Sequence, residues 1–299
     1  MRVCLPRLRC RYFGLALVLL AAGQAWADLP LTVEDLITEQ GRVRLDVSLT
    51  YANVDRQGVS TGEPIEVQTG PTSFVFLPTV IGESIGNTDT WVATLGLRYG
   101  LSAGAEVYLR ASGLSTRTRN FGVAGATSSS ETRFADAWVG LNYRFIDEGD
   151  TPALLGFAEI ALSEQHRQSR ASFQSAMLGL TAYRAIDPIV FSLTAGYRFN
   201  QSRPDGPRDY RPGNLLLLHP SVGFAVNDRV TLSTGLQWTR RAADRIDGQR
   251  QGIDRSASNL VLGVGYGIAR GNTLNASFKA NASGQGGAEF RLNWLYTFQ

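Results

Sequence analysis

The C-terminal segment, residues 288–299, alternates apolar and polar side chains along its length. The even-numbered face is apolar and rich in aromatic rings: Phe290, Leu292, Trp294, Tyr296 and Phe298. The other face is polar except for Leu295. A period of two residues predicts a strand with one face against an apolar medium. A soluble sandwich gives the same alternation, but a terminal strand with aromatics near its end is typical of outer-membrane barrels.

The same alternation recurs along the chain and predicts an all-β fold. Twelve strands are expected at 42–54, 88–101, 105–117, 132–145, 153–163, 173–184, 188–200, 214–226, 230–241, 257–269, 272–281 and 287–298. The strands at 153–163 and 173–184 are the least regular, because Glu159 and Tyr183 interrupt their alternation. We therefore predict a twelve-stranded antiparallel transmembrane β-barrel over residues 42–299.

The connections between these strands alternate in length. The odd-numbered connections are predicted at 5 to 33 residues and the even-numbered ones at 2 to 7. Long loops on one rim and short turns on the other are typical of outer-membrane barrels, with the long loops outside the cell. This arrangement needs an even number of strands and places both termini in the periplasm.

The N-terminal residues predict export. A basic stretch with four arginines precedes the apolar run 13–22, and Ala25-Trp26-Ala27 offers a cleavage site before Asp28. Cleavage would leave 25 basic and 26 acidic residues, so the basic balance of the full chain does not indicate a nucleic-acid partner. Cys4 and Cys10, the two cysteines of the chain, would leave with the signal. Residues 28–41 are expected to form a periplasmic stub, with a short helix at 31–41 that could alternatively plug the lumen.

The first long loop, 55–87, has an unusual composition. It places Phe74-Val75-Phe76-Leu77 between prolines, and an apolar cluster of this size is not expected to stay exposed to water. It could fold inward as a constriction, cap the barrel mouth, contact a ligand, or form a hairpin that would raise the strand count to fourteen.

The inward faces of the predicted strands carry charges of both signs. The residues expected to line the pore are Arg44, Arg98, Glu106, Arg110, Asp136, Arg144 and Arg198. Such side chains can pair across the lumen and stiffen the barrel, or set solute preference in a hydrated passage. Inward glycines such as Gly100 and Gly140 favour open space. Twelve strands predict a narrow or gated lumen. We find no pattern for a cofactor or a metal, and expect none.

Two segments resemble a known family. Residues 95–101 (LGLRYGL) and 134–145 (FADAWVGLNYRF) are similar to the outer-membrane transporter family first linked to the meta-pathway of phenol degradation, which is distantly related to amyloid-export barrels. The resemblance implies a barrel and transport, with no functional residues to carry over. The export branch has an N-terminal coiled coil, whereas here only 31–41 precedes the first strand.

The sequence indicates an outer-membrane channel that passes a small solute through a narrow or gated lumen. The candidate solutes include aromatic and other hydrophobic molecules. Three alternatives stay open: a secretion channel for an exported polypeptide, a barrel that displays its loops, and a lipid hydrolase. The last would use His219 and Ser221 as base and nucleophile, although both are expected to point inward, away from lipid. Expected partners are the solute or polypeptide, outer-membrane lipid, lipopolysaccharide and the barrel-assembly machinery.

Overall fold

The computed structural model describes residues 37–298, except 57–58, 62–64, 78–80, 84, 123–124, 167–168 and 284–286. The predicted signal peptide and its cleavage site lie outside the described residues. Twelve long strands form one sheet: β1 (Val43–Arg56), β6 (Ile85–Ser102), β7 (Ala105–Gly122), β8 (Gly125–Ile146), β9 (Ala153–His166), β11 (Ser175–Ile186), β12 (Ile189–Asn200), β15 (Leu215–Ala225), β16 (Val230–Arg241), β19 (Arg255–Ala269), β20 (Asn272–Asn281) and β21 (Gly287–Phe298).

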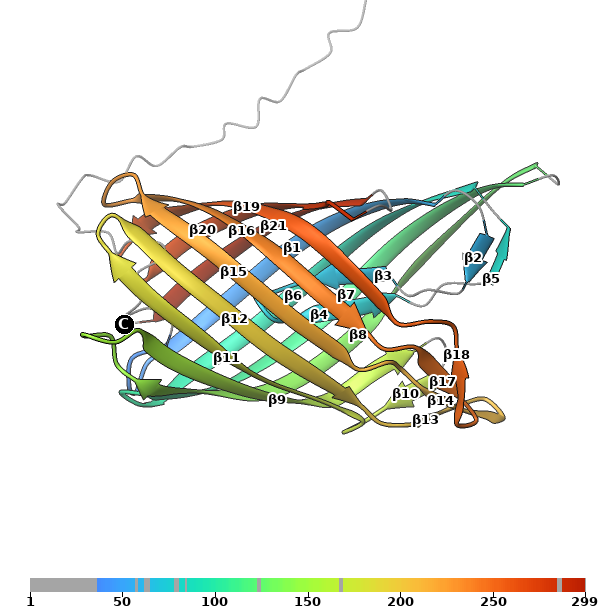
Figure 1. Cartoon of the computed structure of the whole chain (residues 1–299), viewed down its shortest axis with the longest axis horizontal. Coiled ribbons are helices and arrows are strands. Elements are labelled where there is room, and N and C mark those ends of the chain that lie inside the picture. The colour runs from blue at the N-terminus through green and yellow to red at the C-terminus, as the bar shows by residue number, and fades with distance from the viewer. Residues whose placement is uncertain are drawn as a thin grey trace, which may run out of the picture.

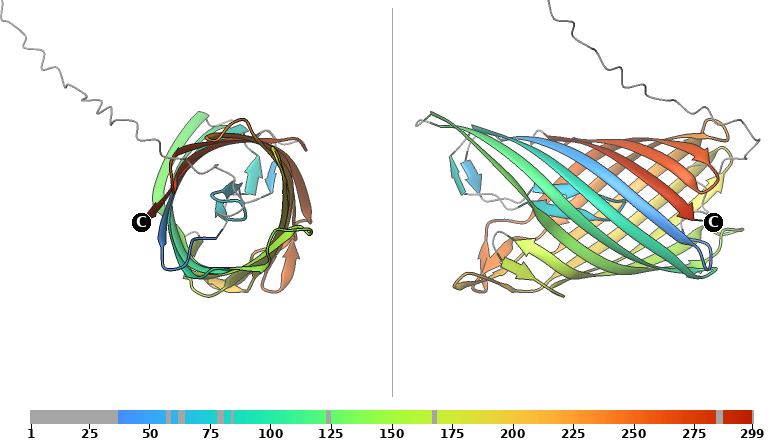
Figure 2. Two further views of the ribbon diagram at one scale, coloured as in Figure 1. Left: turned by 90° about the vertical axis from the view of Figure 1, so that its left-hand side faces the viewer. Right: turned by 180° about the vertical axis from the view of Figure 1, so that it is seen from behind.

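The sheet closes on itself as an antiparallel barrel. Each long strand pairs with the next one in the chain, and β1 pairs with β21 from Val43–Phe298 to Val54–Gly287. Seen along its axis, the sheet is a complete ring (Figure 2). Closure satisfies the backbone groups that an open edge would leave unpaired in lipid. The predicted twelve-stranded barrel is confirmed, including the two irregular strands, which correspond to β9 and β11.

The outer face of the barrel is an apolar belt. Large apolar side chains are exposed on every wall, among them Leu95, Leu97, Leu141, Leu180, Leu193, Leu236, Leu262 and Phe290. Outward aromatic residues pair near both rims: Tyr143–Phe145 and Tyr296–Phe298 near the end with the short turns, Tyr51–Trp91 and Tyr197–Phe199 near the other. Two aromatic girdles around an apolar belt are the pattern of a barrel in the bacterial outer membrane, where this chain resides.

The two ends of the barrel differ (Figures 1 and 2). The C-terminus lies at the end with the short turns, the periplasmic end. The opposite end carries the short extracellular strands: β2 (Val59–Thr61), β5 (Ile81–Glu83), β10 (Ser169–Ala171), β13 (Arg203–Asp205), β14 (Arg208–Arg211), β17 (Asp244–Ile246) and β18 (Gln249–Gln251). The last four form a sheet of their own. Strands β6, β7 and β8 also extend further outward than predicted, because polar residues such as Arg119 and Ser128 continue the ladder above the membrane.

The apolar part of the first long loop, residues 65–77, folds inward. Within it, β3 (Ile65–Gln68) and β4 (Phe74–Leu77) form a two-stranded sheet separate from the barrel. This hairpin lies inside the ring (Figure 2). Of the four possibilities left open by the sequence, the inward fold is therefore the one observed, and fourteen wall strands are excluded.

The expected helix at 31–41 is not borne out over its described part. Residues 31–36 lie outside the described residues, and 37–41 contain no helix. Instead, Gln40 forms a parallel bridge to Gly100. Backbone pairing with β6 therefore replaces the helical hydrogen bonds there. The described residues contain no helix elsewhere, and so none that could cross a membrane.

A charge on the apolar belt should destabilise the barrel. Leu95 is 57% exposed near the middle of β6. We expect Leu95→Arg to lower the free energy of unfolding by about 2–4 kcal/mol, since the guanidinium must enter hydrocarbon. Leu95→Phe is the control and should fold like the parent. The measurement is guanidinium unfolding in lipid vesicles; equal stabilities for the arginine variant and the parent would contradict a lipid-facing belt.

Candidate functional site: the plugged lumen

The periplasmic half of the lumen is crossed by ion pairs. Arg98 Nη1 donates to Glu106 Oε1 at 2.9 Å, and its Nη2 lies 3.5 Å from Asp46 Oδ2. Glu106, which is fully buried, also accepts from Asn142 Nδ2 at 2.6 Å. Arg98 and Glu106 thus face the interior of the barrel and pair with one another there.

The N-terminal segment closes part of this end. The backbone N–H of Thr38 donates to Glu106 Oε2 at 2.7 Å, and Ile37 packs against inward residues of β9 and β11, including Leu155 and Tyr183. Gly100 makes this passage possible, because a Cβ there would lie 2.1 Å from the carbonyl oxygen of Glu39. The sequence predicts that inward glycines leave open space in the lumen. At Gly100 that space is instead occupied by the backbone of residues 38 and 39. Gly140 likewise faces the ring of Tyr108.

A second cluster of charges lies between β7, β8 and β9. Arg110 Nη2 donates to Glu159 Oε2 at 2.9 Å, and Arg110 Nη1 lies 3.9 Å from Asp136 Oδ1. The hydroxyl of Tyr108 donates to Glu159 Oε1 at 2.6 Å. All four side chains are buried. Each charged side chain of the cluster faces one of opposite sign, as burial away from bulk water requires.

The remaining predicted pore residues occupy different levels. Arg198 is buried and pairs with Glu164 toward the extracellular half. Arg44 Nε donates to Thr297 Oγ1 at 3.1 Å near the periplasmic rim. Arg144 lies at that rim as well, with its Nε 2.8 Å from Asp147 Oδ1. The seven residues therefore do not form one ring.

The inward hairpin seats on an apolar patch of the wall. Ile65, Val67, Val75 and Leu77 form one core cluster with Ala52, Val92, Leu114 and Ala135, inward residues of β1 and β6 to β8. On the other side, Phe74 packs against Met177, Leu215 and Leu217 of β11 and β15. The hairpin thus brings an apolar core into the extracellular half of the lumen.

Hydrogen bonds fix the depth of the hairpin. The hydroxyls of Ser48 and Thr50 donate to the carbonyl oxygens of Thr69 and Gln68 at 3.3 and 3.2 Å. The N–H of Gln68 donates to Glu289 Oε2 at 3.2 Å. Since Ser48 lies near the middle of β1, the turn of the hairpin reaches about halfway down the barrel.

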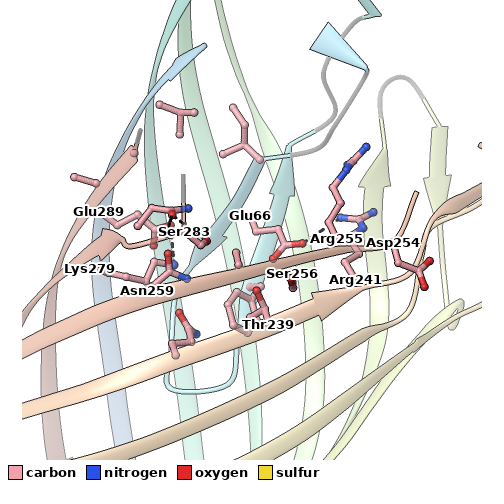
Figure 3. A pocket seen from close by; sticks show the side chains of 18 of the residues that line it. Glu66, Thr239, Arg241, Asp254, Arg255, Ser256, Asn259, Lys279, Ser283 and Glu289 are labelled. Atoms are coloured by element: carbon pink, nitrogen blue, oxygen red, sulfur yellow. Dashed lines mark hydrogen bonds and ion pairs between the residues drawn. The ribbon is translucent and has the colours of Figure 1, made fainter. Parts of the chain in front are cut away.

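An ion pair ties the hairpin to the opposite wall. Arg241 Nη1 on β16 lies 3.6 Å from Glu66 Oε1 (Figure 3). Arg241 Nη2 lies 3.0 Å from Asp244 Oδ1. Burial opposes ionisation of Asp244, but Arg241 and the hydrogen bonds from the Gly213 N–H and the Tyr210 hydroxyl outweigh it and lower its pKa. Arg241 therefore keeps an anionic partner at neutral pH.

Two cavities flank the hairpin. A vestibule of about 440 Å³ lies between the hairpin and the wall from β16 to β21, lined by Glu66, Phe74, Arg241 and the Lys279–Glu289 pair (Figure 3). A smaller cavity of about 170 Å³ lies beyond the hairpin turn, lined by residues 69–73, Arg98, Tyr108 and Glu159. The hairpin thus stands between an extracellular and a deeper space.

The family is shown by its sequence pattern. The family described as "Putative MetA-pathway of phenol degradation" matches residues 54–295. The chain belongs to this family. No curated protein matches the chain by sequence.

Solved structures confirm the fold of this family member. The COG4313 outer membrane channel from Pseudomonas putida F1 has a TM-score of 0.63 at 13% identity, covering 88% of this chain and 98% of that one. The translocator domain of the autotransporter NalP from Neisseria meningitidis has a TM-score of 0.53 at 12% identity, covering 89% and 91%. At these identities the likeness concerns the barrel alone.

The hydrolase pair does not form a catalytic arrangement. The hydroxyl of Ser221 lies 2.6 Å from that of Ser192, and His219 Nδ1 has no hydrogen-bond partner among the described residues. A triad needs the base to contact the nucleophile and a third group to orient the base. Neither contact is present in the described part of this barrel.

Several site residues were missed from the sequence. Glu159 interrupts the alternation of its strand because it is an inward acid that pairs with Arg110. The run Leu215–Leu218 is apolar on both faces because Leu215 and Leu217 support the hairpin. Interruptions of alternation were therefore the available signal. Glu66 and Arg241 carried no signal, since only the inward fold of the loop brings them together.

Breaking the buried Arg110–Glu159 pair should be costly. We expect Arg110→Met to lower the free energy of unfolding by about 3–5 kcal/mol, because Glu159 would be left buried without its cation. The double variant Arg110→Met/Glu159→Gln should recover part of that loss. Guanidinium unfolding of the parent, Arg110→Met, Glu159→Gln and the double variant in one detergent measures the coupling. Strictly additive effects would show that the pair is not coupled in the lumen.

Proposed function

We propose that this barrel is a gated channel for a small solute, with the β3–β4 hairpin as the gate. The observation that carries the proposal is the position of the hairpin. It is anchored by side chains to two walls, is separate from their backbone ladders, and lies between two cavities. A segment held in this way can move without breaking any hydrogen bond between the strands of the barrel wall.

The strength of the anchoring suits a gate. Each hairpin strand is four residues long, and the two pair only with each other. A two-stranded hairpin is marginal by itself and depends on the surfaces that cover it. Here those surfaces are the apolar patch on β1 and β6 to β8, a few hydrogen bonds and the Arg241–Glu66 pair. A modest change in these contacts can therefore shift the equilibrium between a seated and a displaced hairpin.

The size and lining of the lumen favour a small solute over an exported polypeptide. The vestibule and the deeper cavity hold about 440 and 170 Å³, and charged networks fill much of the space around them. The vestibule combines Phe74 and Ile65 with paired charges, a lining suited to a solute with an apolar body and a polar group. The phenol-degradation description of the family supports an aromatic member of that class. We further propose that Arg98, Glu106, Arg110, Asp136 and Arg198 line the path beside the hairpin, with Arg44 and Arg144 at its periplasmic exit.

Locking the hairpin should close the channel. Residues 11–299 contain no cysteine, so no native thiol in this range can compete with an engineered pair for disulfide formation. Ser48→Cys/Thr69→Cys joins the hairpin turn to β1 where the Ser48 hydroxyl already contacts Thr69. In planar bilayers, we expect the oxidised double variant to have a lower conductance than the reduced one. The conductance of each single-cysteine variant should be the same with and without reductant.

Removing the hairpin should have the opposite effect. With 65–77 replaced by a short Gly-Ser linker, single-channel conductance should rise several-fold, because the lumen loses its central obstruction. Heat-modifiable mobility on gels verifies that the barrel is folded. A folded variant without conductance would refute the channel function.

A further inference from the structure

Arginines and aromatic rings alternate across the lumen. The guanidinium of Arg110 lies 5.1 Å from the ring centre of Trp138, and that of Arg198 lies 4.7 Å from the same ring. Arg198 also lies 4.4 Å from the ring centre of Phe76, which Arg241 approaches to 4.9 Å. The stack runs from β7 and β8 through β12 and the hairpin to β16. Phe76 is its only member that belongs to the hairpin.

We propose that Arg198 and Arg241 form a binding slot for the ring of an uncharged aromatic solute, and that Phe76 occupies this slot while the gate is closed. The proposal rests on the channel function proposed above and adds to it a site and a trigger. A solute that takes the place of Phe76 removes one of the contacts that hold the hairpin and so favours opening.

The chemistry of the slot favours a neutral ring over an anion. Arg198 already pairs with Glu164, and Arg241 with Asp244 and Glu66. Their charges are therefore compensated, and an added carboxylate would meet these acids. Their guanidinium groups can still stack on an aromatic face, which Phe76 provides in the closed state.

The geometry also allows exchange. The side chain of Phe76 is only partly buried, and a cavity of about 40 Å³ adjoins it, lined also by Arg198, Tyr210 and Arg241. Arg241 and Glu66 line the larger vestibule as well, which provides a path from the extracellular side. Glu66 and Phe76 are direct partners across the hairpin, so Arg241 contacts both members of one residue pair. A solute bound at Arg241 thus competes with the contacts that Arg241 makes to the hairpin.

The second ring of the hairpin is a matched control. Phe74 packs into the apolar cluster of Met177, Leu215 and Leu217, and its ring centre lies 6.0 Å from Lys279 Nζ. In the described part of the chain its ring stacks on neither guanidinium of the slot. Arg198 Nη1 donates to the Phe74 carbonyl oxygen at 3.4 Å, a backbone contact that does not depend on the Phe74 ring. Phe74→Leu keeps an apolar side chain in that cluster and leaves Phe76 in the slot.

The test compares phenol with cyclohexanol, which has the same size and hydroxyl group but no π face. Calorimetric titration of the purified barrel in detergent is done for the parent, Phe76→Leu, Phe74→Leu and Phe76→Leu/Arg241→Gln. We expect Phe76→Leu to bind phenol roughly 5- to 30-fold more tightly than the parent, since no internal ring competes. Cyclohexanol should show no such gain. Phe74→Leu should match the parent, and the added Arg241→Gln should abolish the gain.

Equal phenol affinities for the parent and Phe76→Leu, or an equal gain for cyclohexanol, would overturn the slot. Bilayer recordings distinguish a failure of the slot hypothesis from a failure of the proposed channel function. A hairpin-deleted barrel that conducts, together with phenol binding that ignores Phe76, refutes the slot alone. Phenol binding that follows the expected order in a barrel that never conducts refutes the channel and leaves the slot standing.

Discussion

The pairing of β1 with β21 is the constraint on which the rest of the structure depends. Twelve residue pairs, from Val43–Phe298 to Val54–Gly287, join the two ends of the sheet and remove its edges. In lipid, an unpaired backbone group has no water to replace its partner, so an open sheet of this length would not be stable. Closure also divides every strand into an outward face that meets acyl chains and an inward face that meets only other inward residues.

The enclosed face explains the chemistry of the lumen. Side chains that point inward lose most of their contact with bulk water, and charges placed there need partners. The barrel meets this need with local clusters, in which Arg98 joins Glu106 and Asp46, and Arg110 joins Glu159 and Asp136. Because each arginine of these clusters faces carboxylates, the wall tolerates buried arginines. Their guanidinium faces stay able to stack on aromatic rings, as on Trp138 and Phe76.

Two segments use the remaining inner surface. The N-terminal residues 37–41 enter at the periplasmic end through Thr38 and Ile37, and the β3–β4 hairpin enters from the extracellular end. Each meets a part of the wall whose inward residues are apolar. The two segments leave a vestibule and a deeper cavity with the hairpin between them. This division supports a gated passage more than a permanently open pore.

The amino-acid sequence alone determined the wall: twelve strands, their order, the long and short connections and the outward belt all follow from a period of two residues, because lipid and lumen impose opposite polarity on successive side chains. It also indicated the inward charges and the apolar segment 74–77. Tertiary structure alone decided where that segment lies, that Arg241 meets Glu66 and Phe76, and that residues 37–41 pair with β6 instead of forming a helix. These contacts join residues far apart in the chain, and their partners are set by the curvature and stagger of the closed barrel, which no local pattern encodes.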